Sequence, residues 1–175
     1  MRSKNEWKGL RIAGTNFEYL DRGAFGIIFA DKQKKLVRKV YKWDEEEKYV
    51  YDVFCSEVKA YTLAANSSDV ATLVPGNFQL CEVQKITDIN GEDITKEFFP
   101  KFAFETEYVP GYFKKISCLE MMRCIDMDDA EWVHKFFKNA GICFTGDMSV
   151  VLESDGTIFK AIDFAVREYE KMHRD

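Results

Sequence analysis

Two glycines and a lysine in the N-terminal part of the chain have the types and the spacing of a phosphate-binding segment. Gly23 and Gly26 lie between two apolar, β-prone runs, and glycine lets backbone amides approach phosphate oxygens with no side chain in the way. Lys39 follows in a third run, where strand alternation places it on one face with Val37 and Tyr41. The segment predicts that backbone amides and one ammonium group meet a phosphate, and an ordinary hairpin without a ligand is the alternative interpretation.

A glutamate on a predicted helix is the expected partner of this lysine. Glu57 falls within the apolar stripe of the helix, one turn from both Val53 and Tyr61. An unpaired carboxylate on a buried face is costly, so Glu57 needs a cation there, and Lys39 is the natural candidate. In the alternative interpretation, Glu57 lies at the edge of the stripe and reaches water.

Two aspartates flank a predicted hairpin farther along the chain. Asp147 precedes the hairpin and Asp163 follows it. Its two short strands, 150–152 and 158–162, are joined by the turn residues Ser154-Asp155-Gly156. Mg²⁺ is usually held by one or two carboxylates together with phosphate oxygens, so the two aspartates predict a magnesium site. Taken singly, each is better explained as a cap or turn residue.

The strand and helix patterns around these residues predict an α+β chain. A strand near 17–20 and the runs that follow form a three-strand antiparallel meander up to residue 42. A helix is expected over 44–66, with Asp44 as its N-cap and acidic residues 45–47 in its first turn. Its apolar stripe consists of Val50, Val53, Phe54, Tyr61 and Ala64.

The middle of the chain predicts a further strand and a polar segment. After a Pro75-Gly76 turn, Phe78 and Leu80 alternate with polar residues as in a strand. The segment 85–96 is polar, and Asn90-Gly91 predicts a turn or an exposed excursion there.

A central strand and a second helix are expected in the remainder. The apolar run 102–109 predicts the strand, and Pro110-Gly111 ends it in a way that suits a linker between lobes. The helix begins at Asp128 or Asp129 and ends at Gly141. Its apolar face consists of Ala130, Val133, Phe136, Phe137 and Ala140.

The composition restricts the class of protein. With 175 residues the chain suits one domain or a compact two-lobed unit, and its 46% of hydrophobic residues can fill a core. The formal net charge of -5 argues against nucleic-acid binding. The chain has no apolar run near the roughly 18 residues of a membrane span and no signal peptide at its start. We expect a soluble, cytoplasmic protein, and export into a host cytosol by a dedicated secretion system stays open.

The cysteines and histidines argue against a metal or disulfide framework. The five cysteines lack CxxC spacing and suit a reducing compartment. Zinc is not expected, because His134 and His173 are the only histidines that could complete a ligand set. His134 lies off the centre of its helix's apolar stripe, so we expect it at the surface without a catalytic role.

The order of these features resembles the protein-kinase fold. The segment 20–28, LDRGAFGII, resembles the glycine-rich loop that covers the phosphates of ATP, with Asp21 at the position of the first glycine. Val37-Arg38-Lys39 is similar to the third-strand lysine motif of that family. Glu57 falls where the family has the helix glutamate that pairs with this lysine.

Two further motifs carry the resemblance. The segment 104–111, FETEYVPG, resembles a kinase hinge, which makes Thr106 the gatekeeper and turns the backbone of Glu107–Val109 toward the adenine. Ile162-Asp163-Phe164-Ala165 resembles the metal-binding Asp-Phe-Gly motif, with alanine at its third position. The resemblance therefore implies ATP and Mg²⁺ as ligands.

The expected catalytic loop departs from the family's pattern. It should carry His-Arg-Asp and, five residues beyond the aspartate, an asparagine. Counting back from the hairpin puts Ser149 at the position of the asparagine and Phe144 at that of the aspartate. In a shortened loop, Asp147 takes over either the metal contact of the asparagine or the role of the base.

The resemblance also implies a domain organisation and a partner. A single kinase-like unit over 1–175 would contain a complete N-lobe and hinge at 17–109 and a minimal C-lobe at 110–175, without an activation segment or a helical substrate platform. This brevity is similar to that of the small effector kinases of type III secretion systems, which bind ubiquitin-charged conjugating enzymes of the host. It implies a protein partner or protein substrate besides ATP.

Two classes of function stay open. The first is an atypical Ser/Thr protein kinase in which Lys39 binds the α- and β-phosphates and Glu57 orients it, while Asp163 holds Mg²⁺ with help from Asp147. The second is a pseudokinase that serves as a protein-interaction module. Asp21 and the altered catalytic loop favour the second class, whereas the retained lysine, glutamate and metal aspartate favour nucleotide binding.

Overall fold

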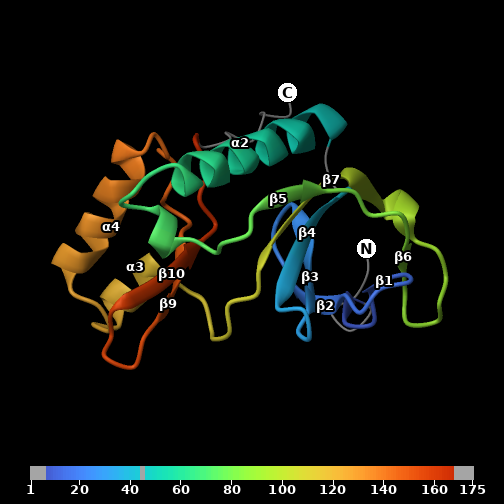
Figure 1. Cartoon of the computed structure of the whole chain (residues 1–175), viewed down its shortest axis with the longest axis horizontal. Coiled ribbons are helices and arrows are strands. Elements are labelled where there is room, and N and C mark those ends of the chain that lie inside the picture. Colours follow the sequence, from blue (N-terminus) through green and yellow to red (C-terminus); the bar gives the residue numbers. More distant parts are fainter. Residues whose placement is uncertain (1–6, 44–45, 168–175) are drawn as a thin grey trace. The chain divides into compact units, whose positions relative to one another are not determined.

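The structure, a computed structural model, describes residues 7–43 and 46–167, which form a mixed α+β protein with antiparallel strands (Figure 1). Contacts along the chain divide it into two units. The first unit comprises the described residues up to Phe54 together with Asn77–Val109. The second comprises Cys55–Gly76 and the described residues from Pro110 onward.

The first unit is built on a sheet whose neighbouring strands all pair antiparallel. Its strands are β1 (Arg11–Ile12), β2 (Glu18–Arg22), β3 (Gly26–Asp31), β4 (Leu36–Lys42), β5 (Gln79–Cys81), β6 (Ile86–Thr87) and β7 (Phe98–Glu107). The order across the sheet is β5-β7-β4-β3-β2-β1-β6. The meander predicted up to residue 42 is confirmed, because β2, β3 and β4 are consecutive neighbours. The central strand predicted over 102–109 is confirmed as the inner strand β7, which begins earlier, at Phe98, and ends at Glu107.

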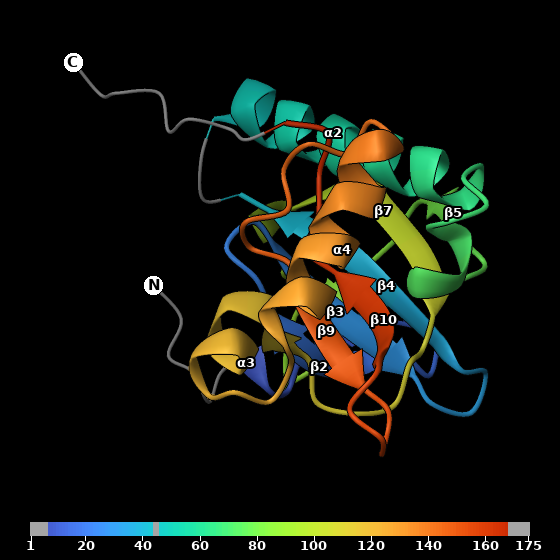
Figure 2. The same ribbon diagram turned by 90° about the vertical axis from the view of Figure 1, so that its left-hand side faces the viewer.

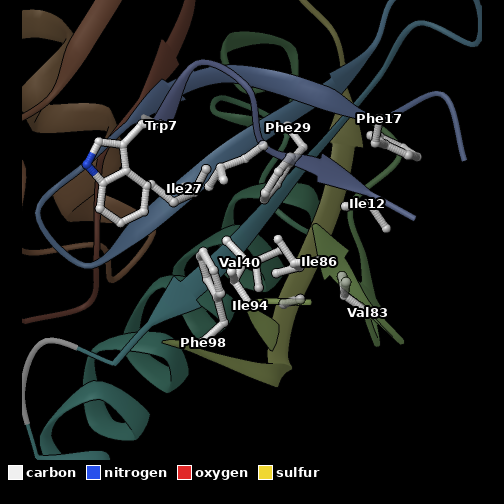
Figure 3. Close-up of a cluster of buried hydrophobic side chains, with 12 residues drawn as sticks. Trp7, Ile12, Phe17, Ile27, Phe29, Val40, Val83, Ile86, Ile94 and Phe98 are labelled. Carbon is white, nitrogen blue, oxygen red and sulfur yellow. The ribbon is translucent and has the colours of Figure 1, made fainter. Parts of the chain in front are cut away.

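The sheet curls around one hydrophobic cluster (Figure 3). Ile27, Phe29 and Val40, from the central strands β3 and β4, are fully buried in its middle. Ile86 joins them from β6 at one end of the sheet, and Phe98 joins them from β7 near the other end. Since strands from both ends contribute to the same cluster, burial of these apolar side chains holds the sheet in its curled form.

The long helix α2 (Glu47–Ala65) confirms the helix expected over 44–66, although Asp44 and Glu45 lie outside the described residues. All five members of its predicted apolar stripe are buried. Phe54, in the first unit, packs edge-to-face on Tyr41 of β4 with ring centroids 5.4 Å apart. Tyr61, in the second unit, packs on Phe164 with centroids 4.7 Å apart.

The second unit combines a small sheet with helices (Figure 2). The sheet has the order β10-β9-β8 and is antiparallel, with β8 (Lys114–Lys115), β9 (Ser149–Leu152) and β10 (Ile158–Ile162). Its helices, beside the part of α2 from Cys55, are α3 (Ile116–Met121) and α4 (Met127–Asn139). The predicted hairpin is confirmed as β9 and β10, and Gly141 ends α4 at a φ of 84°, as expected of a glycine in the left-handed region.

Short elements complete the chain, and several of them were not predicted. Two 3₁₀ helices, η1 (Ala71–Leu73) and η2 (Thr95–Glu97), lie in the connections, one in each unit. The two-residue strands β1, β6 and β8 had no expected counterpart, since a run of two residues has no measurable alternation.

The structure refines three local predictions. The strand predicted around Phe78 and Leu80 is confirmed as β5, and Leu80 is exposed because β5 is the edge strand of its sheet. Of the two alternatives for the segment 85–96, the turn at Asn90-Gly91 is confirmed, and an exposed excursion is excluded because Ile86 and Ile94 are buried in the core cluster on either side of the turn. Helix α4 begins one residue before Asp128, so Asp128 and its neighbour lie in the first turn, and the N-cap position belongs to Asp126.

Among residues 7–43 and 46–167, no helix is long and apolar enough to cross a bilayer. All five cysteines lie in these ranges and carry free thiols.

Candidate functional site

The predicted glycine loop is the turn between β2 and β3 in the first unit. The Gly23 amide donates to the Gly26 carbonyl oxygen over 2.9 Å, which closes the turn. A Cβ atom at position 26 would lie 2.9 Å from the Val40 carbonyl oxygen and 3.4 Å from Cγ of Lys39. Gly26 is therefore required by the close approach of β4, and the structure brings this glycine and the stem of Lys39 together.

Lys39 lies on β4 between β3 and β7. Its Cα is paired with that of Ile28 on one side and Phe104 on the other. Its Nζ lies 5.1 Å from the centroid of the Tyr41 ring, which confirms that the two side chains share a face of the strand, as alternation predicted. The Lys39 ammonium is half-buried and lies over an aromatic ring in the first unit.

The predicted hinge residues lie along the end of β7. Thr106 is buried and pairs with Val37 of β4, and Glu107 pairs with Leu36. Val109 is half-buried and is the last residue of the first unit. The structure thus brings the predicted adenine-side residues and the glycine loop onto adjacent strands β3, β4 and β7 of one sheet.

A polar row across β4, β7 and β5, centred on the buried Glu105, was missed by sequence reasoning. The Nε of Arg38 donates to Glu105 over 2.7 Å, and the side-chain amide of Gln79 donates to the other oxygen of Glu105, also over 2.7 Å. The Arg38 guanidinium lies 4.3 Å from the centroid of the Phe17 ring. Alternation along β4 separates Arg38 from Lys39, so this row belongs to the opposite face of the strand. The signal that singled out Lys39 was a charged residue among apolar neighbours in a strand, and Arg38 shows the same signal.

The second unit places the two predicted metal carboxylates at one end of its sheet. Cα pairing aligns Lys115 of β8 with Ser149 of β9, and Ser149 with Ile162 of β10. Asp147 lies two residues before Ser149, and Asp163 follows Ile162 directly. The hairpin therefore brings the neighbourhoods of both aspartates to the same end, as the sequence predicted.

Lys115 adds a cation to this end of the sheet, and sequence reasoning missed it. Its Nζ is hydrogen-bonded and ion-paired with Oδ1 of Asp147. The hydrogen bond and charge of Asp147 raise the pKa of Lys115, and the charge of Asp163 raises it further. One ammonium group therefore lies within the electrostatic field of both carboxylates. The two-residue strand β8 gave no signal that could have placed Lys115 there.

Asp163 has a constrained backbone held by a buried neighbour. Its φ of 63° lies in the left-handed region, which is uncommon for a non-glycine residue and is enriched at functional sites. Phe164 is buried and packs on Tyr61 and on Phe137, with ring centroids 4.7 Å and 5.0 Å away. This packing fixes the backbone that orients the Asp163 carboxylate.

Glu57 and Asp163 are brought together around Tyr61. Burial raises the pKa of the Tyr61 phenol, and the negative charges of Asp163 and Glu57 raise it further. All three residues belong to the second unit, whereas Lys39 belongs to the first. The pairing of Lys39 with Glu57 stays a prediction, and Glu57 itself is half-buried.

The segment expected to be the catalytic loop is tied to its surroundings by backbone and side chain. Phe144 exchanges two backbone hydrogen bonds with Ala165, of 2.9 Å and 3.0 Å. Nδ1 of His134 lies 2.8 Å from Oγ1 of the buried Thr145. His134 lies off the buried stripe of α4, as predicted, but it is half-buried and not fully exposed, and burial lowers its pKa. Ser149, at the expected asparagine position, is buried at the start of β9.

The donor set suits a metal only together with a ligand. The described ranges contain no group of three or more His, Cys, Asp or Glu side chains that could hold a metal ion. In nucleotide complexes, Mg²⁺ is held by one or two carboxylates, while phosphate oxygens and water complete its coordination shell. The pair Asp147 and Asp163, without a third protein ligand, fits this kind of site. Neither the five cysteines nor His134 belong to such a group among the described residues, and His173 lies outside them.

Comparison of the chain with protein-family models, with curated proteins and with solved structures gave no match.

Proposed function

We propose that this protein binds Mg·ATP through a minimal protein-kinase-like arrangement and transfers its γ-phosphoryl group to a Ser or Thr hydroxyl of a protein. The observation that carries the proposal is the convergence of Asp147 and Asp163 at one end of the three-stranded sheet. A lysine beside a glycine turn is the second support, because Gly26 and Lys39 lie on the paired strands β3 and β4, and a Cβ at position 26 would lie 3.4 Å from Cγ of Lys39. These are the residue types that phosphate and magnesium require.

The residues take the roles that the resemblance assigns. Lys39 binds the α- and β-phosphates, and Thr106 with the backbone of Glu107–Val109 binds the adenine. Asp163 holds Mg²⁺ with help from Asp147, so the metal, when bound, neutralises charge on the phosphates. Phosphoryl transfer depends mainly on positioning and charge neutralisation, which these groups supply.

A catalytically impaired, pseudokinase-like interaction module is the second candidate. It is favoured by Phe144, whose backbone pairs with Ala165 at the position where a kinase has its catalytic aspartate. A general base contributes about 10²- to 10⁴-fold in rate, so its loss leaves slow transfer even when ATP binds. Asp21 also favours this candidate, because it adds negative charge to the turn expected to cover the phosphates.

A thermal-shift titration with ATP, with and without Mg²⁺, tests nucleotide binding. ATP with Mg²⁺ at 100 times its dissociation constant should add about 2.7 kcal/mol to the free energy of unfolding. We expect Lys39→Ala and Asp163→Ala to abolish this gain, while the exposed controls Lys34→Ala and Glu153→Gln retain it. Mg²⁺ alone should have little effect, because the two carboxylates need phosphate oxygens to complete the metal's shell.

Phosphotransfer is measured separately with γ-labelled ATP on the protein itself and on a Ser/Thr-containing acceptor protein. Stabilisation by Mg·ATP without transfer would favour a nucleotide-binding protein that has lost catalysis. An absence of stabilisation by ATP in the presence of Mg²⁺ would overturn the phosphotransferase proposal and point to the interaction module.

A further inference from the structure

Helix α4 presents two faces that differ in their burial. Ala130, Val133 and Phe137 are fully buried and pack the helix into the second unit. A second stripe, spaced by four, three and four residues, consists of Met127, Glu131, His134 and Lys138. These four residues form the wall of an open pocket of about 630 Å³.

The other walls of this pocket come from α3 and from the loop after α4. Glu120 of α3 and the loop residues Cys143, Phe144, Thr145 and Gly146 complete the lining. The hydrogen bond of 2.8 Å between His134 and Thr145 ties the loop to the helix. The pocket is therefore lined by three separate segments that are joined by a side-chain contact.

The charge of the lining is negative. Glu120 and Glu131 contribute two carboxylates against the single ammonium group of Lys138. Burial lowers the pKa of His134, which keeps the imidazole neutral near pH 7. The negative net charge of the lining attracts a cation, whereas an anion would be repelled by the two carboxylates.

Exposed methionines lie in and next to the acidic lining: Met127 is one of the lining residues, and Met121 and Met122 follow Glu120 along the chain. The side chains of Met121, Met122 and Met127 are 79%, 57% and 77% exposed, respectively. Large exposed apolar side chains that are rimmed by polar residues mark sites of protein interaction, and methionine is over-used on surfaces that accept varied partners. The exposed Met127 in the lining therefore favours part of a protein over a small inorganic cation as the occupant.

We propose that this pocket, defined by Glu120, Met127, Glu131, His134 and Phe144, binds an arginine side chain of a partner protein whose flanking apolar residues pack on Met121 and Met122. The inference goes beyond the proposed function and does not depend on nucleotide binding. It concerns the second unit alone, at a face of α4 that the proposed phosphate and metal residues do not use.

Arginine fits this lining better than lysine. Its planar guanidinium offers five donors that can be shared between two carboxylates, whereas lysine offers one compact ammonium group. A guanidinium is also more weakly hydrated and stacks on aromatic faces, such as the Phe144 ring, while its stem packs on thioethers such as Met127.

Methionine-methyl NMR of the full-length protein tests the proposal directly. The protein is labelled with [methyl-¹³C]methionine and titrated with the probe peptide acetyl-Leu-Arg-Leu-amide. We expect saturable shifts of the Met121, Met122 and Met127 methyl signals. The fully buried Met148 belongs to the same unit and serves as an internal reference whose signal should not move.

Matched peptides and variants separate charge recognition from unspecific apolar contact. The isosteric citrulline peptide and the lysine peptide should bind more weakly than the arginine peptide, the citrulline peptide by about tenfold or more, which corresponds to about 1.4 kcal/mol. The double variant Glu120→Gln/Glu131→Gln should weaken arginine binding by a similar factor, while the exposed control Glu153→Gln should not. An unchanged Met148 signal in each variant shows that the fold is intact.

Three results would overturn the proposal. Equal binding of the arginine and citrulline peptides would show that the carboxylates do not recognise the charge. Tighter binding of the lysine peptide would remove the assignment to arginine. Undiminished binding by the double variant, or no saturable shift of the three exposed methionines, would place the contact elsewhere.

Discussion

Each unit contains an ion pair beside its sheet, one between the adjacent strands β4 and β7 and one between β8 and the turn before β9, and the two pairs differ in their exposure. In the first unit, the side chains of Arg38 and Glu105 are 23% and 4% exposed. In the second unit, those of Lys115 and Asp147 are 52% and 59% exposed. The buried Glu105 carboxylate accepts a further hydrogen bond from the exposed Gln79, so both of its oxygens have a partner within the protein.

This difference indicates where ligand chemistry can take place. A buried carboxylate whose two oxygens are both hydrogen-bonded has no room for a metal or a phosphate without loss of the partners that offset its desolvation. An exposed pair keeps most of its hydration and exchanges partners at low cost. The Lys115–Asp147 end of the second unit is therefore accessible to ligand, whereas the Arg38–Glu105 row stabilises the sheet.

The largest expected effect follows from removing the buried Glu105 carboxylate. We expect Glu105→Ala to lower the free energy of unfolding by about 3–5 kcal/mol, because it leaves the Arg38 guanidinium without its carboxylate in a largely buried place. Urea denaturation measures this change. The comparison variant Asp147→Ala breaks the exposed pair and should cost far less, and an equal loss in both variants would contradict the distinction between the two pairs.

A smaller effect is expected when the exposed cation is removed. In Lys115→Met the ammonium group that competes for Asp147 is absent, so less Mg²⁺ should be needed for half-maximal stabilisation by ATP, by about twofold to fivefold. A thermal-shift titration of Mg²⁺ at constant ATP provides the measurement. A higher Mg²⁺ requirement would mean that Lys115 assists ligand binding instead of competing with the metal.

The smallest effect concerns the pH dependence of stability. Burial lowers the pKa of His134, the charge of Glu120 acts in the opposite direction, and the charge of Lys138 lowers it further. Because the pKa of His134 is lower in the folded protein than in the unfolded chain, the unfolded chain binds more protons in the pH range between the two values. The stabilisation from neutral His134 is therefore complete above the unfolded pKa of about 6.5, and it is lost as the pH falls from there to the lower pKa of the folded protein. We expect His134→Gln to lose less stability than the parent protein between pH 7 and pH 5 in urea denaturation. Identical pH profiles would exclude this contribution.

Helices and strands with a long, regular hydrophobic pattern could be predicted from the sequence. Short strands that depend on pairing with a strand elsewhere in the chain could not. The stripe of α2 and the β9–β10 hairpin depend on spacing within a single segment, which the sequence displays directly. The short strands β1, β6 and β8 exist only because a neighbouring strand pairs with them. Leu80 shows the same limit, since its exposure depends on the edge position of β5.

The candidate site divides in the same way. The alignment of Asp147 and Asp163 was predictable, because one local hairpin joins them. The cation beside them was not, because Lys115 reaches Asp147 from 32 residues away along the chain through a strand of two residues. The pairing of Lys39 with Glu57 stays a prediction.

The sequence by itself determined that Arg38 and Lys39 lie on opposite faces of β4, because side chains in a strand alternate at every residue. Only the tertiary structure decided which of these two cations joins a buried carboxylate. Glu105 lies 67 residues from Arg38, and the register between β4 and β7 brings the two together. That register results from packing of the whole curled sheet, whose free energy is distributed over side chains that are remote in sequence.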